Sequence, residues 1–339
     1  MTVVPVPPPA AGMHPTRFGV VVIGRNEGER LRSCLRSVLS DSRRVVYVDS
    51  GSQDGSIEMA SALGVDALPL DMGVPFTAAR ARNVGWRRLV DVDAALDYIQ
   101  FVDGDCEVVP GWMPGAQRFL DEHADVAAVT GWRRERFPQQ SVYNRLCDIE
   151  WTSGVVGETK SFGGDAMIRV RALLESGGYR DDLIAGEDDE ICIRMRARSW
   201  RIWRLDSPMT LHDAAMTRLS QWWNRCMRAG YAYAEGVRLH GRQPERHFIR
   251  QWRSAWLWGL GIPLLLLAAS VWVGPLAFLG LLVYPLQVLR LFSNSSGSRQ
   301  TRAERSIFLV LGKFAEAAGL VKAALHRVSG QGARLIEYK

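Results

Sequence analysis

Short runs of apolar, β-branched residues alternate with amphipathic segments along the first two thirds of the chain. The runs predict buried strands, and the segments between them have the periodicity of helices. Strands alternating with helices indicate an α/β fold with a doubly wound sheet and right-handed crossovers. Strands are predicted at residues 18–23, 44–48, 65–70, 98–103, 125–130, 166–170 and 201–205, and helices at 31–39, 56–63, 76–90, 111–122, 141–151 and 191–198.

Two aspartates separated by one glycine, Asp103-Gly104-Asp105, follow the strand that starts at Tyr98. In an open α/β sheet, ligands bind beyond the carboxyl ends of the strands, so both carboxylates are expected to face a site. Gly104 lets the backbone turn closely there. Mg²⁺ prefers oxygen ligands and is usually held by one or two carboxylates together with substrate phosphates. The alternative is a solvated acidic turn, because this tripeptide is common in turns.

Four consecutive carboxylates, Glu187 to Glu190, precede the helix predicted at 191–198. Acidic residues suit the positive end of a helix dipole, so this run is explained either by helix-start chemistry or by catalysis. His212 is expected in a loop after the last strand, and a lone histidine is more often structural than a ligand.

The C-terminal third contains 35 successive positions without a charged residue, Ala255 to Leu289. About 20 apolar residues span a bilayer. Pro263, Gly274-Pro275 and Pro285 interrupt the run, which predicts two short membrane helices at about 255–273 and 275–292. Arginines flank the run on both sides, and this places both ends of the hairpin on the cytoplasmic side. The alternative is a buried helical pair in a soluble protein.

Three segments complete the predicted organisation of the chain. Residues 1–16 are rich in proline and are interpreted as a disordered leader. Residues 17–240 form the α/β domain, and residues 241–339 form a membrane-associated helical region. Within that region, residues 307–328 carry an apolar stripe on one helical face and are expected to lie along the membrane interface.

The net charge and the cysteine content indicate which partners and which cellular compartment the protein has. The net charge of +6 is modest, and the basic residues gather beside the apolar C-terminal runs, which favours a membrane surface over nucleic acid. The five cysteines show neither disulfide nor zinc spacing, so a reducing cytoplasm is expected. We therefore expect the protein at the cytoplasmic face of the inner cell membrane.

Five stretches, taken together and in this order, resemble the family-2 glycosyltransferases of the membrane-associated bacterial type. The resemblance covers roughly Phe18 to Tyr233 and implies the GT-A fold, a Rossmann-like mixed sheet flanked by helices. The stretches are Val20-Val-Val-Ile-Gly-Arg-Asn-Glu27, Val48-Asp-Ser-Gly-Ser-Gln-Asp-Gly55, Ala81-Arg-Asn-Val-Gly85, Phe101-Val-Asp-Gly-Asp105 and Gly186-Glu-Asp-Asp-Glu190.

The resemblance implies a role for each matching residue. Asp188 matches the general base of an inverting single displacement, which removes the proton from an attacking hydroxyl. Asp103 and Asp105 match ligands of a divalent metal, Mn²⁺ or Mg²⁺, with His212 as a looser match. The nucleotide is expected at Arg25, Glu27, Asp49, Arg82 and Asp103, and the donor or acceptor sugar at Gly164, Asp165, Glu187 and Trp222.

The implied activity is transfer of a sugar from a nucleotide sugar, most commonly a UDP-sugar in this family, to a lipid-linked or oligosaccharide acceptor. The crowded carboxylates Glu187 to Asp189 are expected to raise the pKa of the base. Processive members carry Q-x-x-R-W, whereas this chain has Gln221-Trp-Trp-Asn-Arg225, so addition of a single sugar is predicted. Trp222 and Trp223 would stack on a sugar, lie at the membrane interface or simply pack in the fold.

Two other functions remain open at this point. A nucleotidyltransferase also presents acidic metal ligands at the end of an α/β sheet, but its phosphate-binding loop would be basic, whereas Gly24-Arg-Asn-Glu-Gly28 contains an acidic residue. The chain could instead be a catalytically inactive, membrane-attached protein that binds nucleotide sugars.

Overall fold

The computed structural model describes residues 17–329, so the predicted leader lies outside the described residues. The chain divides into two compact units. The first unit holds the α/β sheet and ends at Ala214, and the second contains the C-terminal helices from Ala215 onward. Two short segments, 138–146 and 183–186, also belong to the second unit.

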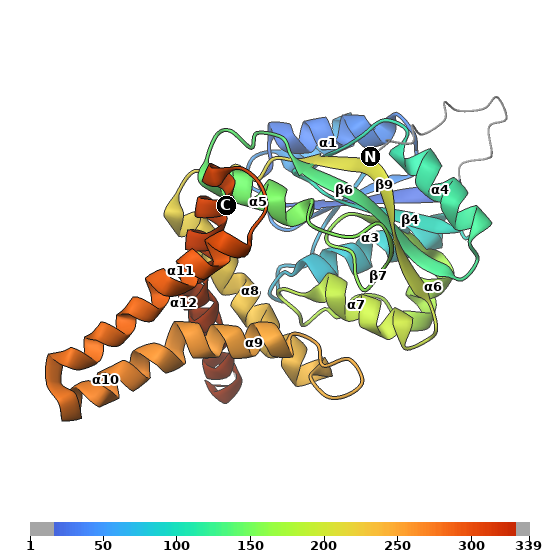
Figure 1. Cartoon of the computed structure of the whole chain (residues 1–339). Coiled ribbons are helices and arrows are strands. Elements are labelled where there is room, and N and C mark those ends of the chain that lie inside the picture. The colour runs from blue at the N-terminus through green and yellow to red at the C-terminus, as the bar shows by residue number, and fades with distance from the viewer. Residues whose placement is uncertain (1–16, 330–339) are drawn as a thin grey trace. The chain divides into compact units, whose positions relative to one another are not determined.

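A nine-stranded mixed sheet forms the centre of the first unit (Figure 1). Its order is β3-β2-β1-β4-β8-β6-β9-β5, with β7 paired to β9. β1, β2, β3 and β4 run parallel, and β8 is antiparallel to β4. The strands are β1 Phe18–Gly24, β2 Val45–Asp49, β3 Asp66–Pro69, β4 Tyr98–Asp103, β5 Cys106–Val108, β6 Val126–Glu135, β7 Gly157–Thr159, β8 Ala166–Arg169 and β9 Arg201–His212.

Helices cover both faces of this sheet, which is why β1 carries apolar side chains on both of its faces. Side chains alternate between the two faces of a strand, so Val20 and Val22 of β1 enter one core while Val21 and Ile23 enter the other. The first core is completed by α1 Glu29–Leu39, α2 Ser56–Ala62 and α4 Trp112–Glu122. The second is completed by α3 Ala78–Val92, α6 Val170–Ser176 and α7 Glu187–Arg196.

Gly85 permits the close packing of α3 on the sheet. A Cβ at this position would lie 2.4 Å from Cγ1 of Val21, so only glycine fits between the helix and β1. This contact fixes α3, which carries Arg82, against the strand whose end borders the site.

The predicted doubly wound α/β architecture and its mixed GT-A sheet are confirmed, with local differences. β6 and β9 extend beyond the predicted 125–130 and 201–205, α7 begins at Glu187 rather than at 191, and β5, β7 and α6 were not predicted. Most of these differences lie near the carboxyl ends of the central strands, where polar side chains interrupt the apolar pattern of the sequence.

The second unit is helical. Its longest helices, α8 and α12, pack closely because glycines lie at their contact: a Cβ on Gly230 would lie 2.0 Å from the Glu316 carbonyl oxygen, and one on Gly319 would lie 2.1 Å from that of Met227. The helices are α8 Leu219–His240, α9 Ile249–Trp256, the π-helix η1 Leu257–Gly261, α10 Ile262–Val273, the 3₁₀-helix η2 Gly274–Leu282, α11 Val283–Asn294 and α12 Arg299–Ser329; α5 Val142–Trp151 precedes them in the chain.

The face of α12 that packs in the fold differs from the predicted apolar stripe. Small residues such as Ala315, Ala317 and Ala323 are buried, whereas Val321 and Leu325 of the predicted stripe are exposed. The long apolar side chains therefore remain free to contact a membrane, which stays a prediction.

Residues Ile249–Asn294 form one helical run of 46 residues that is long and apolar enough to cross a membrane, and none of its most apolar part is buried. The run turns back at Gly274, whose φ is 64°. Tyr284 donates a hydrogen bond to the Trp258 carbonyl oxygen, 2.7 Å away, so the outgoing and returning limbs lie side by side (Figure 1). The predicted hairpin shape is thus present, while its insertion into a membrane remains a prediction.

Candidate functional site

Several acidic side chains meet at one edge of the sheet because of strand register. β1, β2 and β4 are parallel, and Asp49 pairs with Gly24 while Asp103 pairs with Ile23. β8 runs the other way, so Asp165 enters the same edge directly before that strand begins. These carboxylates therefore gather beyond the strand ends, where the site is predicted.

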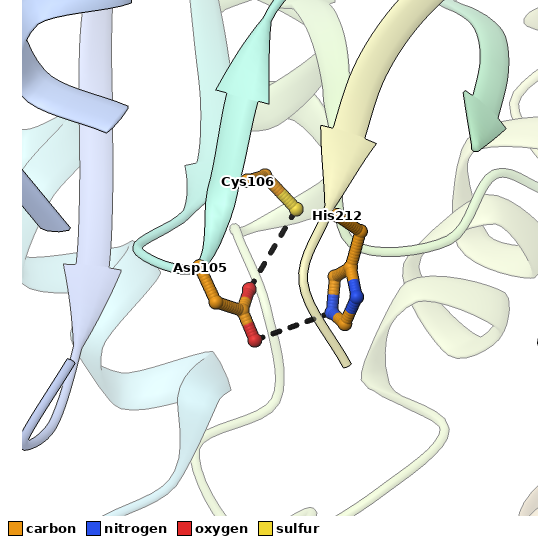
Figure 2. A group of neighbouring side chains, drawn as sticks. All are labelled: Asp105, Cys106 and His212. Atoms are coloured by element: carbon orange, nitrogen blue, oxygen red, sulfur yellow. Dashed lines mark hydrogen bonds and ion pairs between the residues drawn. The ribbon is translucent and has the colours of Figure 1, made fainter. Parts of the chain in front are cut away.

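Asp105 and His212 form a close pair at this edge (Figure 2). The distance between Oδ2 of Asp105 and Nε2 of His212 is 3.2 Å, and both side chains are buried. Cys106 pairs with His212 across β5 and β9, and its thiol donates to Oδ1 of Asp105 over 3.6 Å. Potential ligand atoms of the three residues lie within 4.8 Å of one another.

His212 was expected in a loop, but it is the last residue of β9 and is paired on both sides. Burial lowers its pKa below the usual 6.5, which favours the neutral imidazole that binds metals. Oε2 of Glu135 lies 3.8 Å from Nδ1, and this nitrogen has no hydrogen-bond partner within residues 17–329. With Nε2 facing Asp105, the ring is positioned as metal-ligating histidines are, with a carboxylate behind its other nitrogen.

The residues at this position fit a divalent metal. Asp105 supplies a carboxylate and His212 a neutral imidazole nitrogen, a set that suits Mn²⁺ and leaves coordination positions for water and phosphate oxygens. Burial raises the pKa of the Cys106 thiol well above its usual value, so the sulfur stays protonated and is a poor ligand for a hard cation.

Two buried arginines hold the neighbouring carboxylates. Arg82 donates to Oδ1 of Asp103 at 2.9 Å and to Oε1 of Glu187 at 2.8 Å, and its side chain is only 3% exposed. Arg133 lies 2.9 Å from Oδ2 of Asp165 and 3.3 Å from Oδ2 of Asp103. Both oxygens of Asp103 thus face guanidinium groups, unlike Asp105.

Asp165 anchors the site from within the fold. Its side chain is fully buried; one oxygen accepts from the Asp103 amide at 3.0 Å, and the other accepts from the Thr210 hydroxyl at 2.7 Å. The prediction that Asp165 contacts a sugar is therefore replaced by a positioning role. Gly164, next to it, has φ of 65°, and a Cβ there would lie 2.1 Å from Nη2 of Arg133, so this turn requires glycine.

Asp188 occupies the first turn of α7. Its Oδ2 accepts from the Gly164 amide at 2.8 Å, whereas Oδ1 has no hydrogen-bond partner in the described part of the chain. Burial, opposed by Arg82 and reinforced by Glu187, raises its pKa from 3.8 to about 7. The predicted direction of the shift is correct, but burial rather than like-charge crowding is its main cause.

The loops after β1 and β2 are joined to each other. The side-chain oxygen of Asn26 accepts from the Gln53 amide at 2.8 Å, and the backbone amide of Asn26 donates to the Ser52 hydroxyl oxygen at 2.9 Å. Arg25 stacks on Phe76, with 4.6 Å from its Cζ to the ring centroid. Glu27 pairs with Arg30 at 2.8 Å.

Asp49 is buried and shapes the turn after β2. One oxygen accepts from the Tyr47 hydroxyl at 2.7 Å, and the other accepts from the amides of Gly51 and Ser52 at 2.9 and 2.8 Å. A nucleotide that bonded to this carboxylate would compete with these protein donors.

Trp222, which was expected at a sugar, is a packed core residue of the second unit. Its side chain is 5% exposed, and its ring clusters with those of Tyr143 and Phe308 at centroid distances of 6.4 and 4.9 Å. Because so little of this side chain is exposed in the described part of the chain, the packing alternative fits best.

The sequence did not assign roles to Arg133, Glu135 and Trp151. The edge of Trp151 packs on His212 at 4.6 Å, and Arg133 lies over the Trp151 ring at 5.6 Å. Arg133 and Glu135 alternate along β6, so a strand extended beyond Thr130 would have placed both side chains on one face. The sequence around Trp151 contains no pattern that would have predicted its position beside His212.

Comparison with known proteins shows which sequences and structures this chain is similar to. Residues 19–165 match the family described as glycosyl transferase family 2. The chain is 28% identical over 190 residues to the succinoglycan biosynthesis protein ExoA of Rhizobium meliloti, covering 52% of this chain and 55% of that protein. It is 28% identical over 135 residues to a TPR repeat-containing protein of Synechococcus elongatus, covering 40% of this chain and 32% of that protein.

The match thus spans about half the length of the first relative and a third of the second. Among solved structures, a mannosyltransferase of Pyrobaculum calidifontis in complex with GDP-Man and Mn²⁺ is similar, with a TM-score of 0.56, 17% identity and coverage of 93% of this chain and 88% of that one. At this identity the likeness shows a shared fold.

Proposed function

We propose that this chain, whose residues 19–165 form a family-2 glycosyltransferase domain, moves a sugar from a nucleoside-diphosphate sugar to a hydroxyl group of an acceptor. The observation that carries the proposal is that a buried carboxylate–imidazole pair, Asp105 with His212, occurs on the same sheet edge as Asp188 with its pKa of about 7. The Asp105–His212 pair suits the binding of a divalent metal, and Asp188 suits proton transfer.

Asp105 and His212 would hold Mn²⁺ or Mg²⁺, with Asp103 shared between the metal and the nucleotide ribose. When bound, such a cation neutralises the negative charge that develops on the departing diphosphate. Arg82 and Arg133 keep Asp103 in place, and the Glu135 carboxylate lies 3.8 Å from the ring nitrogen of His212 that faces away from Asp105. The Mn²⁺ in the solved mannosyltransferase structure is consistent with this choice of metal.

Asp188 would act as the general base of an inverting single displacement. The Gly164 amide holds Oδ2, so Oδ1 is the oxygen that accepts the proton of the acceptor hydroxyl. The hydroxyl oxygen forms its bond to the anomeric carbon as the bond from that carbon to the diphosphate oxygen breaks. The nucleoside diphosphate then leaves with both electrons of the broken bond, and the configuration at the anomeric carbon is inverted.

Nucleotide recognition is proposed at the loops after β1 and β2. Arg25 and Glu27 lie on the first loop, and Asn26 ties it to the second. The family resemblance favours UDP as the nucleotide. The altered Q-x-x-R-W stretch favours a single addition without polymer translocation.

The C-terminal hairpin would attach the enzyme to the membrane, with both hairpin ends and the sheet on the cytoplasmic side. Its exposed surface carries large apolar side chains, among them Leu265, Val271 and Trp272, at 67%, 81% and 88% exposure. Arginines before and after the hairpin fit anionic headgroups at one membrane face. A lipid-linked acceptor suits an enzyme held in this way.

The test is release of a nucleoside diphosphate by the full-length protein from a panel of UDP-, GDP- and dTDP-sugars, with Mn²⁺, with Mg²⁺ and with EDTA. The proposal expects one donor class to be turned over in the presence of metal and nucleoside diphosphate to be released. Release of pyrophosphate from a nucleoside triphosphate and a sugar phosphate would instead identify a nucleotidyltransferase. Binding without turnover would identify an inactive nucleotide-sugar-binding protein.

A further inference from the structure

A groove of about 420 Å³ opens within the second unit, between the π-helix η1 and the C-terminal half of α12. Gly259 and Leu260 form one wall, and Phe314, Val321, Lys322 and His326 belong to the other. All other side chains that line the groove are apolar, and its size lies in the range of small-molecule sites.

Local backbone geometry keeps the groove open. Gly259 packs so tightly on α12 that a Cβ would lie 2.0 Å from the Lys313 carbonyl oxygen and 2.6 Å from Cβ of Ala317. Beside this contact, Ala318 is exposed and Leu325 is 62% exposed. The floor of the groove is therefore closed by the helix contact while its mouth remains open to the surroundings.

The polar groups of the groove share one end of it. Lys322 and His326 are one helical turn apart on α12, so their side chains lie on the same face. Lys322 forms no ion pair within residues 17–329, although neighbouring basic residues such as Lys313 and Arg327 are paired with Glu316 and Glu235. Nδ1 of His326 is buried and lacks a hydrogen-bond partner in the same range.

We propose that this groove binds a single-chain lipid that ends in a phosphate or diphosphate, with the hydrocarbon chain against Leu260 and Val321 and the phosphate at Lys322 and His326. An unpaired ammonium and an unsatisfied ring nitrogen at one end of an apolar groove complement such a ligand in both charge and polarity. The inference rests on the membrane attachment proposed above and gives the lipid-linked acceptor a binding site.

A single-chain ligand fits better than a two-chain phospholipid of the bulk bilayer. The groove is one cavity with one polar end, so it accommodates one chain. A terminal phosphate also carries up to two negative charges, whereas the phosphodiester of a bilayer lipid carries one. The ammonium of Lys322 and the unsatisfied ring nitrogen of His326 offer two polar contacts to such a phosphate.

Native mass spectrometry of the full-length protein, released from detergent micelles, tests the inference. The micelles contain equal amounts of hexadecyl phosphate, hexadecanol or phosphatidylglycerol. The inference expects one molecule of hexadecyl phosphate to be retained, with hexadecanol and phosphatidylglycerol each retained about tenfold less. No donor, metal or sugar transfer enters the measurement, so its failure is distinguishable from failure of the proposed activity.

Matched variants locate the lipid. Ala318→Trp places a large ring in the open part of the groove and should abolish retention, while Ala324→Trp, at an exposed position of α12 that does not line the groove, should leave it unchanged. Lys322→Gln should weaken retention of hexadecyl phosphate about tenfold, and Arg299→Gln at the exposed start of α12 should not. Equal retention of all three lipids, or retention unaffected by Ala318→Trp, would overturn the inference.

Discussion

Nε2 of His212 lies 3.2 Å from Oδ2 of Asp105, although the two residues are distant in the sequence. His212 ends β9, Asp105 directly precedes β5, and the pairing of Cys106 with His212 across these strands brings the two side chains together. Glu135 on β6 then meets His212 from the opposite side. Three neighbouring strands thus build one carboxylate–imidazole–carboxylate row.

This row predicts unequal roles for the two aspartates of the Asp-Gly-Asp turn. Asp105→Ala should reduce metal-dependent turnover more than Asp103→Ala, because both oxygens of Asp103 already face Arg82 and Arg133 while Asp105 faces His212. Turnover measured across a Mn²⁺ titration checks the order. A larger loss in Asp103→Ala would contradict the division.

Glu135→Gln should weaken Mn²⁺ binding about 10- to 100-fold, because the carboxylate orients the ring and raises the basicity of the ligating nitrogen. Isothermal titration with Mn²⁺ measures the effect. Glu107→Gln is the matched control, since Glu107 lies on β5 and pairs with Arg136 away from the His212 ring. Equal Mn²⁺ affinity in both variants would remove Glu135 from this role.

Asp188→Asn should abolish sugar transfer while leaving nucleotide binding intact, because Oδ1 would lose the ability to accept a proton. In the wild type, turnover should rise with pH through about 7, where the carboxyl loses its proton. Single-turnover rates from pH 5 to 9 measure the profile. A turnover rate that stays flat across pH 7, or activity retained in the Asn variant, would assign the base elsewhere.

The same pKa shift makes a prediction about stability. The Asp188 carboxyl has a higher pKa folded, about 7, than its unfolded 3.8, so the folded state binds the proton more tightly. Its stabilising contribution is complete below about pH 4 and is lost as the pH rises through about 7. Urea unfolding of the wild type and of Asp188→Asn at several pH values measures this contribution. Between about pH 4 and pH 7, the free energy of unfolding of the wild type should fall relative to that of the variant. If the two free energies change with pH in parallel, the raised pKa of Asp188 is refuted.

Arg82→Ala should destabilise the first unit by about 3–5 kcal/mol, because it leaves the buried Glu187 and the half-buried Asp103 without their guanidinium partner. Chemical denaturation measures the change. Arg87→Ala, at an exposed position of the same helix, serves as the control and should change stability by less than about 0.5 kcal/mol. Similar effects of the two substitutions would argue against the buried network.

Insertion of the hairpin predicts how its exposed positions respond to charge. Leu265→Arg and Val271→Arg together should release the protein from membranes, because an arginine at the centre of a bilayer helix costs about 2.5–3.5 kcal/mol. Fractionation after carbonate extraction measures this. Val92→Arg, equally exposed on α3 in the first unit, is the control. If the wild type and the variant were both found in the soluble fraction, the hairpin would not be inserted in a membrane.

The buried strands and the helices packed on them could be predicted from the sequence, because residues such as Val20 and Val22, buried on one face, and Val21 and Ile23, buried on the other, form an uninterrupted apolar run. The strand ends were less predictable. β9 continues to His212 through polar residues such as Asp206, and its pairing with β5 and β6 is a long-range effect that local periodicity does not contain.

The sequence pointed to those residues of the candidate site that lie in a motif, and it missed those that only the fold brings to the same place. Asp103, Asp105 and Asp188 lie in recognisable stretches, whereas Glu135 gains its role only from register with His212. Trp222 shows the opposite error, since a tryptophan that suits sugar stacking is instead buried against Tyr143 and Phe308. Asp165 likewise supports Asp103 from the core.

The central claim is metal-assisted sugar transfer at the Asp105–His212 edge. Nucleoside-diphosphate release from the best donor should be measured for the full-length wild type and for Asp105→Ala, each with Mn²⁺ and with EDTA. The account predicts release by the wild type with Mn²⁺, almost none with EDTA, and almost none from Asp105→Ala under either condition. Equal release by the two proteins, or release that EDTA does not change, would contradict it.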